Sequence, residues 1–328
     1  MIYDLIQSNG ISGKSKKNKF KMSKEIKIVV LGGSGMLGSM INDFISRNSN
    51  FSITSTVRNN ELMNKCKSVF PKINWEILDV LDTNENELDK IIGDSKWLIN
   101  AIGVIKPYIN EQKPFEIERA IKINSSFPYL LARIAKRKGA KILQIATDCV
   151  YSGKKGSYVE DDLHDALDVY GKSKSLGECY SDVVSNIRCS IIGPEFKGNL
   201  SLLQWFLGQP DGTKLNGFVN HDWNGITTLH FAKICYSIIR NKLEIGYLHH
   251  LIPSDKVNKY DLLLMFKKYF GREDLVINSQ KADQCIDRTL STKNQELNLR
   301  IWNSVGFANP PSVEEMIKDL GKYKYSFL

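Results

Sequence analysis

Apolar and polar residues alternate between short runs rich in valine, isoleucine and aromatic residues and longer stretches with helical spacing. This pattern predicts strands over residues 26–31, 51–57, 75–78, 97–101, 141–146 and 186–192, and helices over residues 36–45, 117–137 and 172–184. Short strands that alternate with helices of this length are typical of βαβ units. We therefore expect an α/β fold of the Rossmann type, with a doubly wound parallel sheet.

The regular alternation ends after residue 192. Gly193 and Pro194 open a segment richer in glycine, asparagine and tryptophan, and helical spacing returns over 228–240, 259–269 and 311–323. We predict a basic disordered tail over 1–24, a Rossmann domain over 25–192 and a smaller substrate-binding region over 193–328. Parts of that last region could return to the Rossmann core and close over the carboxyl edge of the sheet, where open α/β folds bind ligands.

Composition excludes several classes of protein. With 42% hydrophobic and 25% charged residues in 328, the chain is not predominantly disordered. Its apolar runs fall short of the roughly 20 residues of a membrane helix, and the N-terminus does not resemble a secretory signal. The six cysteines form no CxxC pair and no cluster with the five histidines, which argues against a metal site. We expect a cytoplasmic protein without a membrane partner.

The net charge of +9 is unevenly distributed. Residues 1–24 contain six lysines and one aspartate, so the rest of the chain carries only +4. A mild positive charge favours an anionic small molecule and does not call for nucleic acid as a partner.

A glycine motif follows the first predicted strand. Gly32, Gly35 and Gly38 make G-x-x-G-x-x-G at the start of the first predicted helix. Such a turn lets the backbone approach a pyrophosphate, which sits on the helix N-terminus. We therefore predict dinucleotide contacts from this turn, including those from Ser34, Met36 and Leu37.

The end of the second predicted strand indicates which dinucleotide binds. NAD-selective sites carry an acid about 20 residues after the glycine turn, whereas residues 55–60 of this chain contain Arg58 and no acid. An arginine can pair with a 2′-phosphate, so NADP(H) is the predicted cofactor.

A second motif, Y-x-x-x-K, is formed by Tyr170 and Lys174. Residues four apart share one helix face, and a neighbouring ammonium is expected to lower the pKa of the phenol towards neutral pH. Thr147 adds a hydroxyl at the end of the fifth predicted strand.

Together these motifs resemble the extended short-chain dehydrogenases, most closely their dTDP-4-dehydrorhamnose reductase branch, from residue 25 to the late 230s. Residues 147–153 match T-D-x-V-[FY]-x-G and residues 170–178 match Y-G-x-[ST]-K-x-x-G-E. The resemblance implies a catalytic triad of Thr147, Tyr170 and Lys174. It also implies that five further residues lie beside the cofactor: Asp79, Val80, Asn100, Ala101 and Gly103. For Asn124 it implies a structural or proton-relay role.

Cys149 departs from this branch, whose members carry an aromatic residue there. Nucleotide-sugar epimerases of the same superfamily resemble this chain in having cysteine, paired with a lysine. A thiol can act as acid or base beside a C4 ketone, which acidifies the hydrogens on C3 and C5. Cys149 is therefore either catalytic, with Lys197 or Lys106 as its partner, or a packed cysteine.

The resemblance implies an NADP(H)-dependent reductase of a UDP- or dTDP-linked 4-keto-6-deoxy sugar. A C3-epimerase activity would make it bifunctional, yielding an L-rhamnose- or N-acetyl-L-rhamnosamine-type donor. Substrate contacts are expected from five residues: Lys106, Asn124, Lys197, Asn199 and Trp223. By family analogy we expect a homodimer. The alternative is a non-catalytic subunit that resembles the regulatory subunit of methionine adenosyltransferase.

Overall fold

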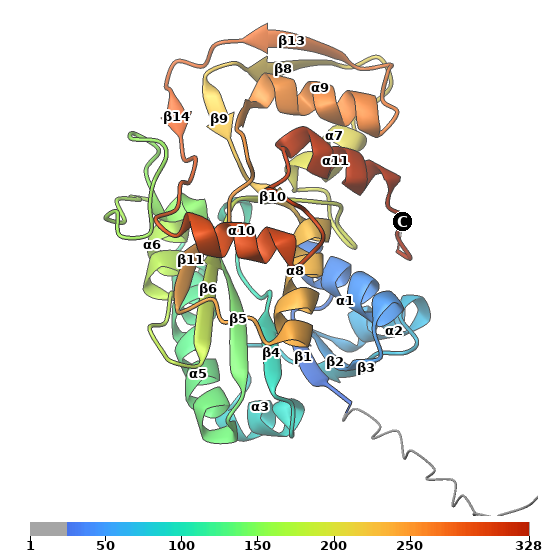
Figure 1. Cartoon of the computed structure of the whole chain (residues 1–328), viewed down its shortest axis with the longest axis vertical. Coiled ribbons are helices and arrows are strands. Elements are labelled where there is room, and N and C mark those ends of the chain that lie inside the picture. Colours follow the sequence, from blue (N-terminus) through green and yellow to red (C-terminus); the bar gives the residue numbers. More distant parts are fainter. Residues whose placement is uncertain (1–24, 328) are drawn as a thin grey trace, which may run out of the picture.

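The computed structural model describes residues 25–327 and places a parallel sheet at the centre of the molecule (Figure 1). Seven strands lie in the order β11-β6-β5-β4-β1-β2-β3, and every neighbouring pair is parallel. The strands are β1 (Lys27–Leu31), β2 (Ser52–Val57), β3 (Asn74–Ile77), β4 (Trp97–Asn100), β5 (Lys141–Ala146), β6 (Val184–Arg188) and β11 (Leu248–His250). The predicted α/β fold is confirmed.

Helices cover both faces of this sheet because its strands are apolar on both sides. The helices of this part are α1 (Met36–Asn48), α2 (Asn60–Val69), α3 (Glu85–Ile92), α4 (Pro114–Ile121), α5 (Phe127–Lys138), α6 (Val169–Leu176) and α8 (Thr228–Asn241). In β1, Ile28 and Val30 pack in the cluster that contains α1 and α8, whereas Val29 and Leu31 face the cluster with α3 and α5. The strand order reverses between β1 and β4, and open α/β sheets have their ligand crevice at such a point.

The third predicted helix is wrong at both ends. The sequence predicts residues 172–184, whereas α6 begins at Val169, since Asp168 accepts a hydrogen bond from the Gly171 amide at 2.8 Å. The helix ends before Gly177, where a Cβ would lie 1.8 Å from the Asn124 carbonyl oxygen. The close approach of the Asn124 backbone therefore requires glycine at position 177, and a turn leads from there to β6.

Two other boundaries differ from the prediction. The expected strand over 186–192 is divided into β6 and a short β7 (Ile191–Ile192). The expected helix over 117–137 consists of α4, one π-helical turn (Lys122–Ser126) and α5. Such π turns often occur at functional sites, and this one carries the buried Asn124.

The C-terminal region forms small sheets and helices above the carboxyl ends of the central strands (Figure 1). Its strands are β8 (Lys214–Phe218), β9 (His221–Trp223), β10 (Ile226–Thr227), β12 (Val257–Asn258), β13 (Val276–Gln280) and β14 (Ile286–Asp287), and its helices are α7 (Leu202–Leu207), α9 (Lys259–Tyr269), α10 (Gln295–Asn303) and α11 (Val313–Lys322). Short 3-10 turns lie at Lys106–Tyr108 and Asp148–Val150. Strand β11 returns to the edge of the central sheet beside β6, and α8 packs on α1.

The proposed domain limits at 24 and 192 stay predictions, and the basic tail lies outside the described residues. Within residues 25–327, no helix combines the length and apolar character required to cross a membrane.

Candidate active site

The glycine turn between β1 and α1 leaves the start of the helix open to a ligand. Gly32 has a φ of +83°, and a Cβ on Gly38 would lie 2.2 Å from the Gly32 carbonyl oxygen. The N-cap residue of α1 is Gly35, which has no side chain to satisfy the first amides of the helix. The amides of Met36, Leu37 and Gly38 are therefore available to an anion, and the turn fits a dinucleotide pyrophosphate.

The other predicted cofactor residues lie along the carboxyl ends of β2, β3 and β4. Arg58 follows β2 directly and is exposed. Asp79 and Val80 follow β3, and the Asp79 carboxylate accepts a hydrogen bond from the Leu81 amide at 3.0 Å. The remaining three, Asn100, Ala101 and Gly103, form the end of β4 and the loop after it. Carboxyl ends of adjacent parallel strands share one edge, so these groups border the same crevice.

The predicted triad comes together at the carboxyl end of β5. Thr147 follows that strand, and its hydroxyl donates a hydrogen bond to the Asp148 carboxylate at 3.2 Å. Thr147 also acts on Tyr170 of α6, because hydrogen bonding with it lowers the pKa of the phenol. One turn further along α6, the buried Lys174 donates a hydrogen bond to the Ile145 carbonyl at 2.9 Å. A phenol, a second hydroxyl and an ammonium thus lie near the carboxyl end of β5, the strand next to β4.

Burial dominates the electrostatics of the triad. It raises the pKa of Tyr170, and negative charge on Cys149 would raise it further, whereas the hydrogen bond with Thr147 lowers it. Burial also lowers the pKa of Lys174 to about 8, against the opposing charge of Glu178. The expected lowering of the tyrosine pKa by Lys174 is therefore not found, because low-dielectric surroundings disfavour the phenolate.

Cys149 lies beside the triad in a small charged cluster. Its amide donates to the Thr147 hydroxyl at 3.2 Å. Burial, together with the neighbouring Asp148 carboxylate, raises the pKa of the thiol to about 12, although Arg288 opposes the shift. Burial likewise raises the pKa of Asp148, against the positive charges of Arg288 and Lys259. At neutral pH the cysteine is therefore a thiol, which can donate a proton.

Lys259 is a lysine whose ammonium interacts electrostatically with Asp148 and Cys149. It is the first residue of α9, and its ammonium lies 5.4 Å from the centroid of the Trp223 ring. Pairing of β12 with β9, which sets Val257 opposite Trp223, carries the start of α9 to this place. Burial lowers the pKa of Lys259 to about 8, partly offset by the charges of Asp148 and Cys149.

The two lysines proposed from the sequence lie elsewhere. Lys106 forms an exposed ion pair with Asp168, the N-cap of α6, at 3.1 Å. The ammonium of Lys197 lies 3.1 Å from the Ser34 hydroxyl, at the glycine turn and thus on the cofactor side of the crevice.

The other three residues expected to contact the substrate differ in whether their side chains are free to do so. Asn124 accepts from the Val104 amide at 2.8 Å and donates to the Val104 carbonyl and the Ser173 hydroxyl, so its side chain is occupied in holding α6 to the loop after β4. This placement supports its structural role and does not support a substrate contact. Trp223 is buried and donates to Ser190, while Asn199 is exposed in the loop after β7.

Sequence reasoning missed Lys259, Asp148 and Arg288. One signal was present for Lys259: a lysine directly after the N-cap Asn258 opposes the helix dipole, which favours negative charge there. Arg288 had no local signal, since it reaches the cluster through strand β14, and its Nε donates to the Tyr151 carbonyl at 2.8 Å.

A buried network supports the triad from behind. Arg188, fully buried at the end of β6, binds the Glu178 carboxylate, the Tyr151 hydroxyl at 2.7 Å and the Nε2 atom of His250 at 2.5 Å. Glu178 also belongs to the charges around Lys174. The network fixes the segment between α6 and β6 and neutralises the buried guanidinium.

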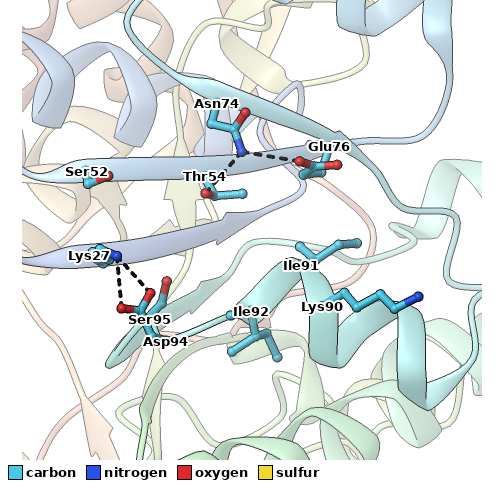
Figure 2. A pocket seen from close by; sticks show the side chains of 11 residues that line it. Lys27, Ser52, Thr54, Asn74, Glu76, Lys90, Ile91, Ile92, Asp94 and Ser95 are labelled. Atoms are coloured by element: carbon cyan, nitrogen blue, oxygen red, sulfur yellow. Dashed lines mark hydrogen bonds and ion pairs between the residues drawn. The ribbon is translucent and has the colours of Figure 1, made fainter.

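A hollow of about 400 Å³ lies at the opposite edge of the sheet, among residues that begin β1, β2 and β3 (Figure 2). Lys27 and Asp94 form an exposed ion pair there at 2.9 Å. Open α/β sheets bind ligands at the carboxyl edge, so we do not place the active site in this hollow. In residues 25–327, no cluster of three or more metal-ligating side chains occurs.

Solved structures share the fold of this chain. A dTDP-4-dehydrorhamnose reductase from Bacillus anthracis in complex with NADP has a TM-score of 0.69, with 17% identity over 90% of this chain and 98% of that chain. A UDP-glucuronic acid 4-epimerase from Bacillus cereus, in complex with a fluorinated UDP-sugar and NAD, has a TM-score of 0.68, with 16% identity over 90% and 99% of the two chains. At these identities the likeness shows the fold alone.

Sequence comparisons point to the same group of proteins. A dTDP-4-dehydrorhamnose reductase from Aggregatibacter actinomycetemcomitans is 28% identical over 155 residues, which are 46% of this chain and 45% of the relative. The methionine adenosyltransferase 2 subunit beta of Pongo abelii is 25% identical over 154 residues, 46% of this chain and 41% of the relative. The chain thus matches less than half the length of these curated relatives. Residues 26–192, which are more than half of the chain, match the family described as RmlD substrate binding domain, and the chain therefore belongs to that family.

Proposed function

We propose that the protein is an NADP(H)-dependent reductase of a nucleotide-linked 4-keto-6-deoxy sugar. The observation that carries this proposal is the meeting of Thr147, Tyr170 and Lys174 beside a glycine turn that fits a dinucleotide. Membership of the RmlD family and the similarity to a dTDP-4-dehydrorhamnose reductase support it.

The triad can perform the proton chemistry of ketone reduction. When bound, NADPH would supply the hydride that adds to C4. Tyr170, held as a neutral phenol by burial, gives its proton to the developing alkoxide, and Thr147 donates a hydrogen bond to the same oxygen. Lys174 would hold the cofactor ribose and stabilise the phenolate left behind.

We further propose that Cys149 and Lys259 invert the configuration at C3 before C4 is reduced. The C4 ketone acidifies the C3 hydrogen, so a base can remove that proton to form an enolate. Lys259, with a pKa of about 8, has a neutral amine fraction that can act as this base. The Cys149 thiol then returns a proton to the opposite face, and no net electrons are transferred.

A second candidate is a non-catalytic nucleotide-binding subunit, favoured by the similarity to methionine adenosyltransferase 2 subunit beta. The complete Thr147–Tyr170–Lys174 constellation supports the enzyme instead. The family-based homodimer stays a prediction in either case.

The test is NADPH oxidation by the purified protein in heavy water, with UDP- and dTDP-linked 4-keto-6-deoxy sugars as substrates. Nuclear magnetic resonance of the product would locate deuterium. Turnover with deuterium at C3 supports an epimerase and reductase, whereas turnover without it leaves a reductase only. NADPH binding without turnover of any donor would favour the regulatory subunit.

The variant Cys149→Ser separates the two activities. We expect it to lose formation of the C3-inverted product and to retain reduction of a substrate that already has the product configuration at C3. Undiminished formation of the C3-inverted product in this variant would exclude Cys149 as the group that returns the proton.

A further inference from the structure

Three cationic side chains from separate parts of the chain interact electrostatically near the glycine turn, and Lys197 contacts the turn directly. Arg58 follows β2, Lys65 lies on α2 and Lys197 belongs to the loop after β7. The ammonium of Lys197 is 3.1 Å from the Ser34 hydroxyl. Lys65 donates to the Phe196 carbonyl at 3.5 Å and lies 4.9 Å from the centroid of that ring, which places it beside Lys197 in the fold.

These cations have no carboxylate partner within the part of the chain that the structure describes. Burial lowers the pKa of Lys197, and the positive charges of Arg58 and Lys65 lower it further. The nearest acid in sequence, Glu195, instead accepts a hydrogen bond from the Ser201 amide. Like charges held together without an anion are unfavourable, so the cluster is electrostatically prepared for a negatively charged ligand.

The shape of the surroundings fixes which anion fits. Ser34 lies within the glycine turn, next to the amides that fit a pyrophosphate, and Arg58 lies at the end of β2, where a dinucleotide presents its adenosine ribose. A ligand group that binds between Ser34 and Arg58 would therefore be attached to the 2′ position of that ribose. An acid at this position would have indicated a 2′-hydroxyl, and three cations indicate a dianion.

We propose that Arg58, Lys65 and Lys197 together bind the 2′-phosphate of the dinucleotide, and that Lys197 is the contribution of the C-terminal region to cofactor selection. The proposal rests on the proposed function only in taking the ligand to be a dinucleotide.

This arrangement links cofactor binding to the position of the loop over 193–201. Phe196 packs against Phe70, with ring centroids 6.1 Å apart, so the loop already rests on the segment that follows α2. A phosphate that bridges Arg58 and Lys197 would tie the loop to the end of β2. NADP(H), and not NAD(H), would then stabilise the C-terminal region against the Rossmann half.

The test measures dissociation constants of NADP+, NAD+ and 2′,5′-ADP by calorimetry with the full chain. Contacts of charged groups with phosphate correspond to about 10- to 100-fold in affinity. We expect Lys197→Met and Lys65→Met each to weaken NADP+ and 2′,5′-ADP binding by about tenfold or more, with less than about threefold change for NAD+. Lys67→Met, on the same helix α2 and also exposed, is the matched control.

Three results would overturn the inference. Equal losses for NADP+ and NAD+ in Lys197→Met would assign Lys197 to the pyrophosphate, and unchanged affinities in both variants would leave the cluster without a role in cofactor choice. If the unaltered protein binds neither NADP+ nor 2′,5′-ADP, the proposed cofactor fails as well. Thermal unfolding of each variant without ligand checks that it is folded.

Discussion

The Rossmann half and the C-terminal region contribute to the candidate site in different ways. In the Rossmann half, functional groups lie within short motifs at the ends of regular elements, as Gly35, Thr147 and Tyr170 do. In the C-terminal region, Lys197 and Lys259 meet groups more than a hundred residues away, at Ser34 and Asp148. The two parts therefore differ in how their groups reach the site: local motifs place those of the Rossmann half, and contacts between distant segments place those of the C-terminal region.

The physical reason lies in how each part is built. Parallel strands bring every carboxyl end to one edge, so the Rossmann half needs only short loops to assemble a site. The C-terminal region reaches the same edge through small sheets, and pairing of β9 with β12 and β14 fixes the start of α9 and the strand before Arg288. Substitutions in the two parts should therefore affect different steps.

The largest effect is expected from Tyr170→Phe, which removes the proposed proton donor of the Rossmann half. General acid catalysis contributes about 10²- to 10⁴-fold, so we expect ketone reduction to fall by about a thousandfold. NADP+ affinity should change little, because the phenyl ring preserves the packing of α6. Tyr180→Phe, at an exposed position, is the control. Reduction at the unaltered rate would remove Tyr170 from the mechanism.

A smaller and more selective effect is expected from Lys259→Met in the C-terminal region. Loss of the proposed base should slow deuterium exchange at C3 by about a hundredfold and spare reduction of a substrate already in the product configuration. Lys268→Met, on the exposed side of the same helix α9, should change neither rate. In the unaltered protein, exchange should rise as pH increases through about 8, because only the neutral amine of Lys259 accepts a proton. Exchange that is independent of pH and of Lys259 would contradict the division between the two parts.

The same division explains what the sequence could predict. The glycine turn, Arg58, Thr147 and the pair Tyr170 and Lys174 were found because each follows or begins a regular element whose pattern is visible locally. The fold and its family were predicted for the same reason.

The remaining features depend on contacts between distant segments. Lys259 could not be assigned to Cys149 without the pairing of β9 with β12. Gly177, directly after α6, lies against the backbone of Asn124, and no pattern within residues 172–184 contains that contact. Lys197 was placed on the substrate side because its loop follows the sixth strand, whereas its side chain turns towards the glycine turn.

The smallest expected effect concerns the strand that joins the two parts. His250 on β11 lies between Arg188, 2.5 Å from its Nε2 atom, and the Ser291 carbonyl, 2.7 Å from its Nδ1 atom. These neighbours suit a neutral ring that donates from Nδ1 and accepts from the guanidinium at Nε2. Burial, with the charge of Arg188, lowers the pKa of His250 to about 4 from 6.5, against the opposing charge of Glu160.

Protonation of His250 should therefore destabilise the fold. The unfolded chain takes up this proton first, so stability is lost as pH falls from about 6.5 towards 4, by about 2 kcal/mol between pH 7 and 5 for this group. Denaturant unfolding at several pH values should show a shallower loss in His250→Gln, whatever its absolute stability. His221→Gln, at a partly exposed ring on β9, should keep the full slope. Parallel curves for His250→Gln and the unaltered protein would mean that burial beside Arg188 does not lower the pKa of His250 in the folded protein.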